Sequence, residues 1–376
     1  MKLLILTQKI DKNDDLLGFF YAWVGEFAKY YKKITVICLY RGESDLPENV
    51  KVLSLGKENL SSREVPDKGR YVSLFYCFTV KLLYILNFYR YIWQERKNYD
   101  RVFIHMNPEY GVLGGWVWKL MGKKMVMWYT HKAVNLKLRI AEKFVSTVFT
   151  ASADSFQLNS KKARVVGHGV DVDKFAGRPP EADQPKYNEK LMAENSVLYV
   201  GRISKIKNQM LLVRAADYLV NKKDIWNFKF NFIGEPVYDR DKKYFEEIKR
   251  FIKDKKIQEY IEFSGKVSHN NMPREYQNAD LLVNLCPTGG MDKAVLEAMS
   301  CERGVIAFNK TFEKLLGKYQ EELILSNEDP EELGEKINKF LNKSEEEKKS
   351  IGKNLREEII ENHSMEKLIK NLVAYI

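Results

Sequence analysis

The chain has 376 residues and a formal net charge of +11, and 45% of its residues are apolar. This length favours two domains, and the apolar content is sufficient for two cores. No uncharged stretch of about 18 residues occurs, which argues against a transmembrane helix. The four cysteines are far apart and lack metal-ligand spacing, so we expect reduced thiols in the core.

Strands and helices alternate along the first half of the chain. Apolar runs predict strands at residues 2–7, 34–39, 50–55, 101–105, 124–130 and 145–151, with helical patterns between them. Such alternation is typical of βαβ units and a parallel sheet. No small-residue cleavage site follows the first run, so we interpret it as a strand rather than a signal peptide and expect a cytoplasmic protein.

Residues 71–93, YVSLFYCFTVKLLYILNFYRYIW, predict a helix that is apolar and aromatic on almost every side. Two basic residues, Lys81 and Arg90, interrupt the run. A helix of this composition can lie in a membrane interface, but mid-chain helices of doubly wound domains are usually buried. We expect burial, with the interfacial position as the alternative, and the same holds for Trp116 and Trp118.

A composition break at Gly177-Arg178-Pro179-Pro180 predicts a linker. The second half then repeats the alternation, with expected strands at 197–200, 228–234, 261–263, 281–285 and 305–308. The tail from residue 345 predicts helix with a break near Ser364. The sequence therefore predicts an α/β fold with domains at 1–177 and 178–350, followed by a C-terminal helix over 351–376.

The positive charge is concentrated in the N-terminal half. Up to Arg178 the chain has 29 Lys and Arg against 17 Asp and Glu, whereas the remainder has 33 against 34. A basic domain suits an anionic partner, such as a phosphorylated lipid carrier, an anionic membrane leaflet or a charged glycan. No nucleic-acid-reading motif is present, so we expect no nucleic-acid partner. Charge that serves solubility alone is the remaining alternative.

Two cationic residues follow the strand predicted at 197–200. Gly201 and Arg202 come directly after it, and Lys207 precedes the next helical pattern. Glycine permits a tight turn at the carboxyl end of a parallel strand, where open sheets bind ligands. Arg202 and Lys207 can both reach a diphosphate from there. Taken alone, the two cations are more typical of a solvated basic surface.

A small-residue loop follows the strand predicted at 281–285 and leads into a helix that contains Glu297. This arrangement places free backbone N–H groups where they can meet an anion. Glu297 lies about one turn into the helix among apolar residues, where a carboxylate needs hydrogen-bond donors. The hydroxyls of a ribose are suitable donors. Together with the Arg202 segment, this pattern predicts a nucleotide-binding site.

Five segments, in order and in register, resemble the family 4 glycosyltransferases, which are retaining, nucleotide-sugar-dependent enzymes of the GT-B fold. The segments are HGVDVDKF from His168, Gly201-Arg202 with Lys207-Asn208, FIGEP from Phe232, FSGKV from Phe263 and LEAM from Leu296. The resemblance implies two Rossmann-like doubly wound domains that face each other across a deep cleft. The N-terminal domain would bind the acceptor and the C-terminal domain the donor, and residues 351–376 would cross back to the first domain.

The resemblance also implies roles for residues of the C-terminal domain. Glu297 would hold the donor ribose, and Arg202 and Lys207 would stabilise the charge that grows on the departing diphosphate. The remaining donor-binding candidates lie within or beside these segments: Gly201, Glu235, Lys266, Val267, Gly289, Gly290, Met291 and Asp292.

The family's motif contains two glutamates separated by seven residues, and the chain departs from it at the first. Glu297 matches the second glutamate, whereas Gly289 stands at the first position. Asp292 is a neighbouring residue that can supply a carboxylate instead. This departure leaves the donor sugar open. It also motivates an alternative in which the protein binds a nucleotide or a glycan without catalysis.

His131 follows the strand predicted at 124–130. The resemblance implies a histidine at this position that faces the donor sugar. Its imidazole can hydrogen-bond a sugar hydroxyl or help to carry the acceptor proton. The other acceptor-side candidates end strands, open the first loop or adjoin His131: Thr7, Lys9, Gly18, His105, Asn107 and Lys132.

These interpretations converge on a glycosyltransferase that moves a sugar from a UDP-, GDP- or ADP-linked donor to a glycan or polyprenyl-phosphate-type acceptor. No acidic pair has metal-ligand spacing, and cationic side chains replace a divalent ion, so we expect neither a metal nor a cofactor. Membrane contact would be peripheral, through the basic N-terminal domain at the cytoplasmic face. A GT-B epimerase or phosphorylase is a further alternative.

Overall fold

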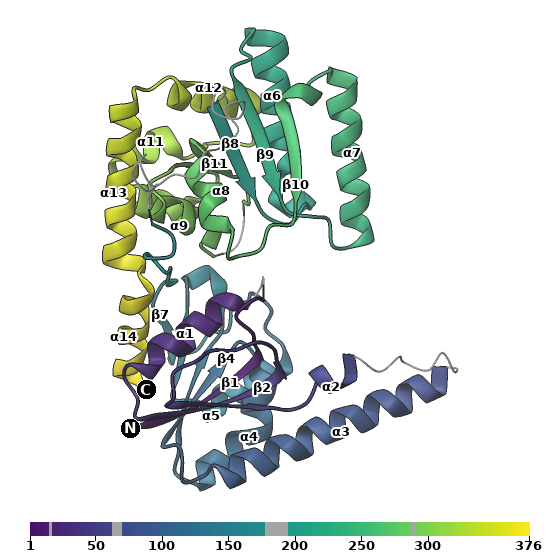
Figure 1. Cartoon of the computed structure of the whole chain (residues 1–376), viewed down its shortest axis with the longest axis vertical. Helices are drawn as coiled ribbons and strands as arrows, with labels where there is room; N and C mark the ends of the chain where they lie inside the picture. The colour runs from purple at the N-terminus through teal and green to yellow at the C-terminus, as the bar shows by residue number, and fades with distance from the viewer. Residues whose placement is uncertain (15–16, 62–69, 177–194, 288–289) are drawn as a thin grey trace. The chain divides into compact units, whose positions relative to one another are not determined.

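The computed structural model describes residues 1–14, 17–61, 70–176, 195–287 and 290–376, with the backbone alone for residues 60–61 and 70–78. The chain divides into two compact units, of which the first consists of Met1–Gly167 and Met365–Ile376 and the second of His168–Ser364 (Figure 1). Residues 168–176 group with the second unit because Val170 and Phe175 are buried in its core. The predicted linker and the boundary after residue 177 fall outside the described residues, so that boundary stays a prediction.

The first unit contains a seven-stranded parallel sheet in the order β3-β2-β1-β4-β5-β6-β7. On β1, Leu3 and Ile5 enter the core on one face of the sheet, and Leu4 and Leu6 enter the core on the other. Burial on both faces explains the continuous apolar runs of these strands. The strands are β1 (Lys2–Ile10), β2 (Lys33–Arg41), β3 (Val50–Ser54), β4 (Arg101–His105), β5 (Lys124–Trp128), β6 (Thr147–Thr150) and β7 (Ala163–Val165), and the helices are α1 (Gly18–Ala28), α2 (Glu58–Ser61), α3 (Arg70–Gln94), α4 (Pro108–Leu120), α5 (Leu136–Phe144) and α14 (Met365–Tyr375).

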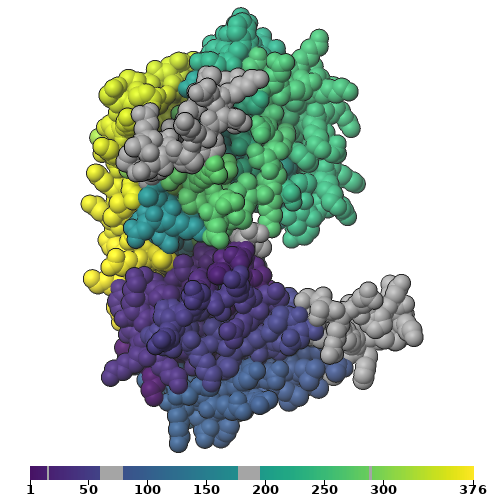
Figure 2. Space-filling view, in the orientation of Figure 1, coloured from purple at the N-terminus to yellow at the C-terminus, as the bar shows by residue number. Residues whose placement is uncertain are grey.

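The second unit contains a five-stranded parallel sheet in the order β10-β9-β8-β11-β12. One continuous apolar cluster fills its interior, and the yellow atoms of α13 lie along one flank (Figure 2). The strands are β8 (Asn195–Val200), β9 (Phe228–Ile233), β10 (Ile261–Gly265), β11 (Leu281–Asn284) and β12 (Gly304–Ala307), and the helices are α6 (Gln209–Lys223), α7 (Asp239–Lys255), α8 (Met272–Asn278), α9 (Lys293–Ser300), α10 (Glu313–Leu316), α11 (Gln320–Leu323), α12 (Pro330–Leu341) and α13 (Glu345–His363).

The predicted α/β class with two doubly wound parallel sheets is confirmed, and every predicted strand is present within a few residues. The sequence did not predict β7. This strand has only three residues, Ala163–Val165, at the edge of the sheet, and a segment so short carries no readable periodicity.

The C-terminal tail is helical and breaks at Ser364, as predicted. The part before the break, α13, packs on the second unit through Ile351, Leu355 and Ile359. The part after it, α14, belongs to the first unit, where its apolar face packs against α1. Leu368, Ile369 and Leu372 form that face because residues three and four apart lie on one side of a helix.

Helix α3 is only partly buried, contrary to the expectation of burial. In Figure 1 it runs along the outside of the first unit and extends past the sheet. Phe88 and Ile92 lie in the core, whereas Leu86 and Trp93 are exposed. Burial is likewise correct for Trp118 and wrong for Trp116. In the part of the chain that the structure describes, no helix is long and apolar enough to cross a bilayer.

Three of the four cysteines, Cys38, Cys286 and Cys301, are free and buried, as predicted. Burial raises the pKa of the Cys38 and Cys301 thiols to about 12, so both stay protonated at neutral pH. The side chain of Cys77 lies outside the described residues.

Candidate active site

Three glycines shape the carboxyl edge of the second sheet. Gly201, Gly234 and Gly265 end β8, β9 and β10, with φ angles of 154°, 136° and 67° that strain residues with a side chain. The N–H of Gly234 donates to the Gly265 carbonyl at 2.7 Å, and the N–H of Gly201 donates to the Ile233 carbonyl at 2.9 Å. A Cβ on Gly234 would lie 2.2 Å from the Gly201 carbonyl oxygen. Glycine therefore allows the loops after these strands to approach one another closely.

The two predicted donor-binding segments follow β8 and β11, which lie side by side in the sheet. From β8 the chain continues to β9 and β10 on one side, and from β11 it continues to β12 on the other. Loops diverge at such a switch point, and α/β proteins bind ligands in the crevice that they leave. The loop with Arg202 and Lys207 and the loop with Gly290, Met291 and Asp292 both begin at this point. Gly289 lies outside the described residues.

Buried polar side chains hold the loop after β8. Gln209 is fully buried, donates to the Arg202 carbonyl at 3.0 Å and accepts from the Ser204 N–H at 3.2 Å. The hydroxyl of Tyr199 donates to the Lys207 carbonyl. Burial raises the pKa of Tyr199 well above its ordinary value, so this hydroxyl stays a donor. These bonds fix the backbone of Lys207 before any ligand binds.

Lys207 forms an ion pair with Asp292. Asn284, at the end of β11, donates to the same carboxylate oxygen at 3.0 Å. Burial acts to raise the pKa of Asp292, but Lys207, together with hydrogen bonds from Asn284 and the Ala294 N–H, holds that pKa below its ordinary value. Burial likewise acts to lower the pKa of Lys207, but Asp292 raises it. Both groups therefore stay charged near neutral pH.

Glu297 lies one turn into α9, and its side chain is largely buried. The hydroxyl of Tyr276 donates to its Oε2 at 2.9 Å, and Nε2 of His269 lies 3.4 Å from its Oε1. Nζ of Lys174 lies 3.0 Å from the other ring nitrogen of His269. The carboxylate thus has the donors that burial requires. Because a carboxylate accepts about four hydrogen bonds, it keeps lone pairs for a ligand.

Two more titratable residues lie near the amino end of α9. Burial lowers the pKa of Lys293 to about 7, although Glu297 and Asp292 act in the opposite direction. Burial, helped by the charge of Lys293, lowers the pKa of His168 to about 3. At neutral pH the His168 imidazole is therefore uncharged, and Lys293 is partly charged.

Arg202 contacts residues that follow β9, whereas Asp292 follows β11. Its Nε lies 3.7 Å from Oδ2 of the buried Asp241, and its guanidinium lies 5.3 Å from the centre of the Tyr238 ring. Its charge also acts on Lys207, whose pKa it lowers slightly against the larger effects of burial and Asp292. Arg202 and Lys207 therefore contribute positive potential to the same loop.

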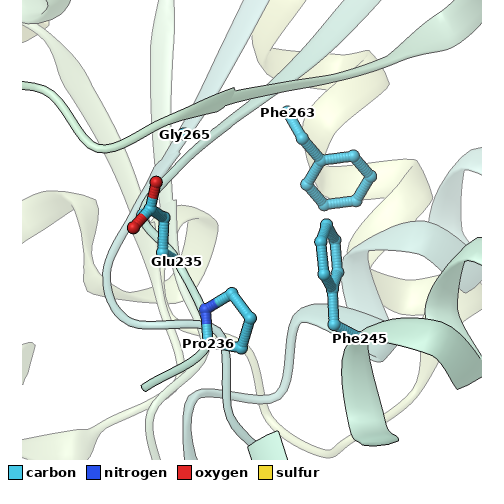
Figure 3. A pocket seen from close by; sticks show the side chains of 6 residues that line it. Glu235, Pro236, Phe245, Phe263 and Gly265 are labelled. Atoms are coloured by element: carbon cyan, nitrogen blue, oxygen red, sulfur yellow. The ribbon is translucent and has the colours of Figure 1, made fainter. Parts of the chain in front are cut away.

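A pocket of about 350 Å³ lies at the carboxyl ends of β9 and β10. Glu235 and Pro236 line one side, and the rings of Phe245 and Phe263 pack edge to face at 4.9 Å on the other (Figure 3). Lys266 and Val267 follow directly after Gly265, which also lines the pocket. The volume and the mixed apolar and polar lining suit a small planar group.

The acceptor-side candidates lie in the first unit, where β1 and β4 form the equivalent switch point. Lys9, near the end of β1, forms ion pairs with Asp11 at 3.2 Å and with Asp14 at 2.6 Å. Gly18 opens α1, and its N–H donates to the Asp14 carbonyl at 2.8 Å. The first loop is thus organised around one lysine and two carboxylates.

The candidates near β4 and β5 differ in exposure. Thr7 and His105 are buried and lie 3.1 Å apart, and the His105 ring stacks on Phe20 at 3.6 Å. Because both side chains are buried, we expect Thr7 and His105 to position neighbouring residues rather than to contact an acceptor. His131 is exposed, and its Nδ1 accepts from the Ala133 N–H at 3.0 Å. Asn107 is the half-buried N-cap of α4, and Lys132 is exposed.

The structure brings Lys207, Asp292 and Glu297 together at one edge of the second sheet. Three residues that support Glu297, namely Lys174, His269 and Tyr276, were not among the predicted site residues, and neither was Lys293. Two of these residues had a signal in the sequence, since Lys174 lies in the HGVDVDKF segment and Lys293 adjoins Asp292, whereas His269 and Tyr276 had none. Within the described ranges, no three His, Cys, Asp or Glu side chains are placed to hold a metal ion, and metal independence stays a prediction.

Comparison with known proteins matches residues 181–358 to the family model of the glycosyl transferases group 1. A curated relative from Escherichia coli, a UDP-Gal:α-D-GlcNAc-diphosphoundecaprenol α-1,3-galactosyltransferase, is 25% identical over 230 residues. That match covers 55% of this chain and only 57% of the relative.

Solved structures match over the full chain. Anabaena HepE, in complex with UDP and glucose, has a TM-score of 0.71 at 15% identity and is covered to 99%. Sucrose-phosphate synthase from Thermosynechococcus elongatus has a TM-score of 0.69 at 15% identity and is covered to 98%. At these identities the likeness establishes the fold alone. The chain has the GT-B fold, and its residues 181–358 match the glycosyl transferases group 1.

Proposed function

We propose that the protein transfers a hexosyl group from a nucleotide-diphosphate sugar to a glycan or lipid-linked acceptor, with retention of configuration and without a metal ion. The observation that carries this proposal is that Lys207 and Glu297 lie at the same switch point. The Tyr199 hydroxyl fixes the backbone of Lys207, and Glu297 is buried and accepts a hydrogen bond from Tyr276. A nucleoside diphosphate offers phosphates to the lysine and a ribose diol to the carboxylate, so one ligand satisfies both groups.

UDP is the donor nucleotide that we favour. The name of the Escherichia coli relative specifies UDP-Gal, and the HepE structure contains UDP. The acceptor in that relative's name is a lipid diphosphate, and the N-terminal half of this chain carries the excess positive charge that such an acceptor would meet.

In the proposed reaction the bond between the anomeric carbon and the β-phosphate oxygen breaks, and the diphosphate leaves with the electron pair. Lys207 and Arg202 stabilise the charge that develops on it. An acceptor hydroxyl forms the new bond to the anomeric carbon, and its proton passes to the departing diphosphate. His131 is the candidate to hydrogen-bond the sugar or to take part in this proton transfer.

Calorimetric titration with UDP, GDP and ADP in the absence of metal tests the donor site. We expect one nucleotide, UDP, to bind with a dissociation constant of about 1–100 µM, as is common for substrates. If no nucleotide binds with or without Mg²⁺, the proposal is wrong.

The glycine at position 289 supports one competing function, nucleotide or glycan binding without catalysis, because the first carboxylate of the motif is missing. Asp292 provides a carboxylate nearby, but Lys207 and Asn284 already engage it. Release of UDP from UDP-sugars in the presence of acceptor separates the two functions. Binding without any release would favour the non-catalytic protein.

The affinity for UDP should decrease as the pH rises above about 7. The pKa of Lys293 is about 7 in the free protein, and a bound diphosphate would favour its ammonium form, so binding above this pKa requires proton uptake. We expect up to about tenfold weaker binding per pH unit. Titration in two buffers with different ionisation enthalpies measures the uptake. Lys293→Met should abolish it, and an unchanged pH profile in this variant would contradict the assignment.

A further inference from the structure

The described part of helix α3 has two apolar faces, and only one of them is covered by residues that the structure describes. Phe88 and Ile92 are 1% exposed and pack in the core with Trp118. On the opposite face, Leu82, Leu86 and Trp93 have exposed fractions of 45%, 57% and 59%. These residues are spaced by four and seven positions, so they lie along one side of the helix.

The exposed apolar surface continues onto α4. Tyr89 links the two helices, because its hydroxyl donates to the Leu113 carbonyl at 2.8 Å and its ring lies 6.5 Å from that of Trp116. Trp116 is exposed, and so is Leu120 one turn later. We call this surface the α3 face and define it as Leu82, Leu83, Leu86, Trp93, Trp116 and Leu120. Exposed apolar side chains that neighbour one another, unlike scattered ones, are typical of an interaction site.

All charged residues of helix α3 are basic. From Arg70 to Gln94 the sequence contains no Asp or Glu, and Lys81 and Arg90 are exposed. The guanidinium of Arg96 lies 4.5 Å from the centre of the Trp93 ring. Tryptophan with arginine and lysine beside leucine is the composition of helices that lie in the boundary between lipid headgroups and acyl chains.

We propose that the α3 face docks on an anionic lipid bilayer. The leucines and tryptophans enter the interface, and Lys81, Arg90 and Arg96 meet lipid phosphates. Charge complementarity favours this occupant over a second copy of the chain, since two α3 faces would bring like charges together. Docking goes beyond the proposed transfer reaction and does not depend on it. If both hold, docking brings the enzyme to a lipid-linked acceptor.

Co-sedimentation of the full chain with vesicles tests the proposal. We expect binding to phosphatidylcholine vesicles that contain about 30% phosphatidylglycerol, weaker binding to phosphatidylcholine alone, and a decrease with added salt. The variant Leu82→Ser/Leu86→Ser/Trp93→Ser should lower the apparent affinity at least about tenfold. The control Trp226→Ser removes a tryptophan of similar exposure, 56%, from the second unit and should bind as wild type does.

A second variant tests the charges without removing apolar side chains. Lys81→Ser/Arg90→Ser should weaken binding to anionic vesicles and reduce its dependence on salt. This variant keeps the proposal testable if the triple variant fails to fold, which its thermal unfolding curve and UDP binding would report.

Three results would overturn the proposal: no binding of the wild type to anionic vesicles, full binding by the folded triple variant, or full binding with unchanged salt dependence by the charge variant. A fourth is a wild-type dimer in solution that the triple variant abolishes, since the α3 face would then join two copies. None of these results depends on nucleotide binding by the wild type. Titration with UDP tests the proposed function separately, so the failure of docking can be distinguished from the failure of the proposed function.

Discussion

Glu297→Gln should weaken UDP binding by about ten- to a hundredfold, the range for loss of a hydrogen bond to a charged group. In the free protein the carboxylate already accepts from Tyr276 and lies beside His269. An amide turns one acceptor oxygen into a donor, which then faces either the Tyr276 hydroxyl or a ribose hydroxyl. Calorimetry with UDP on both proteins measures the effect.

Two control variants separate direct contact from support. Tyr276→Phe removes one hydrogen bond to Glu297 but keeps the carboxylate and the ring packing, so we expect a loss of only about three- to tenfold. Glu262→Gln changes an exposed glutamate of the same unit and should bind UDP as wild type does. Unchanged UDP affinity in folded Glu297→Gln would show that this carboxylate does not hold the ribose.

Lys207→Met should lower turnover with the donor sugar by about a hundred- to a thousandfold, as expected when a group that stabilises transition-state charge is lost. It should also destabilise the protein by about 1–3 kcal/mol, since Asp292 would be left without its partner in a partly buried position. The rate of UDP release and the midpoint of thermal unfolding report the two effects separately.

The double variant Lys207→Met/Asp292→Asn distinguishes catalysis from folding. It removes the uncompensated carboxylate, and the new amide can still hydrogen-bond Asn284, so most of the stability should return while turnover stays low. Recovery of turnover together with stability would mean that Lys207 acts only by balancing the charge of Asp292.

A surface ion pair provides the matched reference for stability. Lys222 pairs with Glu331 at 2.7 Å, but both side chains are more than half exposed. Lys222→Met should therefore change the free energy of unfolding by less than about 1 kcal/mol and leave UDP release unchanged. A large effect of this variant would show that loss of lysine charge in general, rather than the position of Lys207, decides the outcome.

The sequence predicted the sheets well because parallel strands buried on both faces must be continuously apolar. Residues 3–6 and 281–285 carry this pattern. The prediction from sequence failed at β7, where three residues at a sheet edge give no pattern. It also failed on the outer side of α3. There, Leu82 and Leu86 look like core residues in the sequence, and only the position of the helix at the edge of the first unit shows that nothing described covers them.

The sequence also predicted the candidate donor site of the second unit. Gly201, Lys207 and Glu297 occur in segments whose strand–loop–helix pattern is readable without tertiary information, because it depends on contacts local in the chain. Tertiary structure alone decided which groups surround them. Tyr276 and His269 meet Glu297, and Asp292 meets Lys207 from 85 positions away. Ion pairs and pKa values depend on such distances, and folding fixes them through packing that leaves no local trace in the sequence.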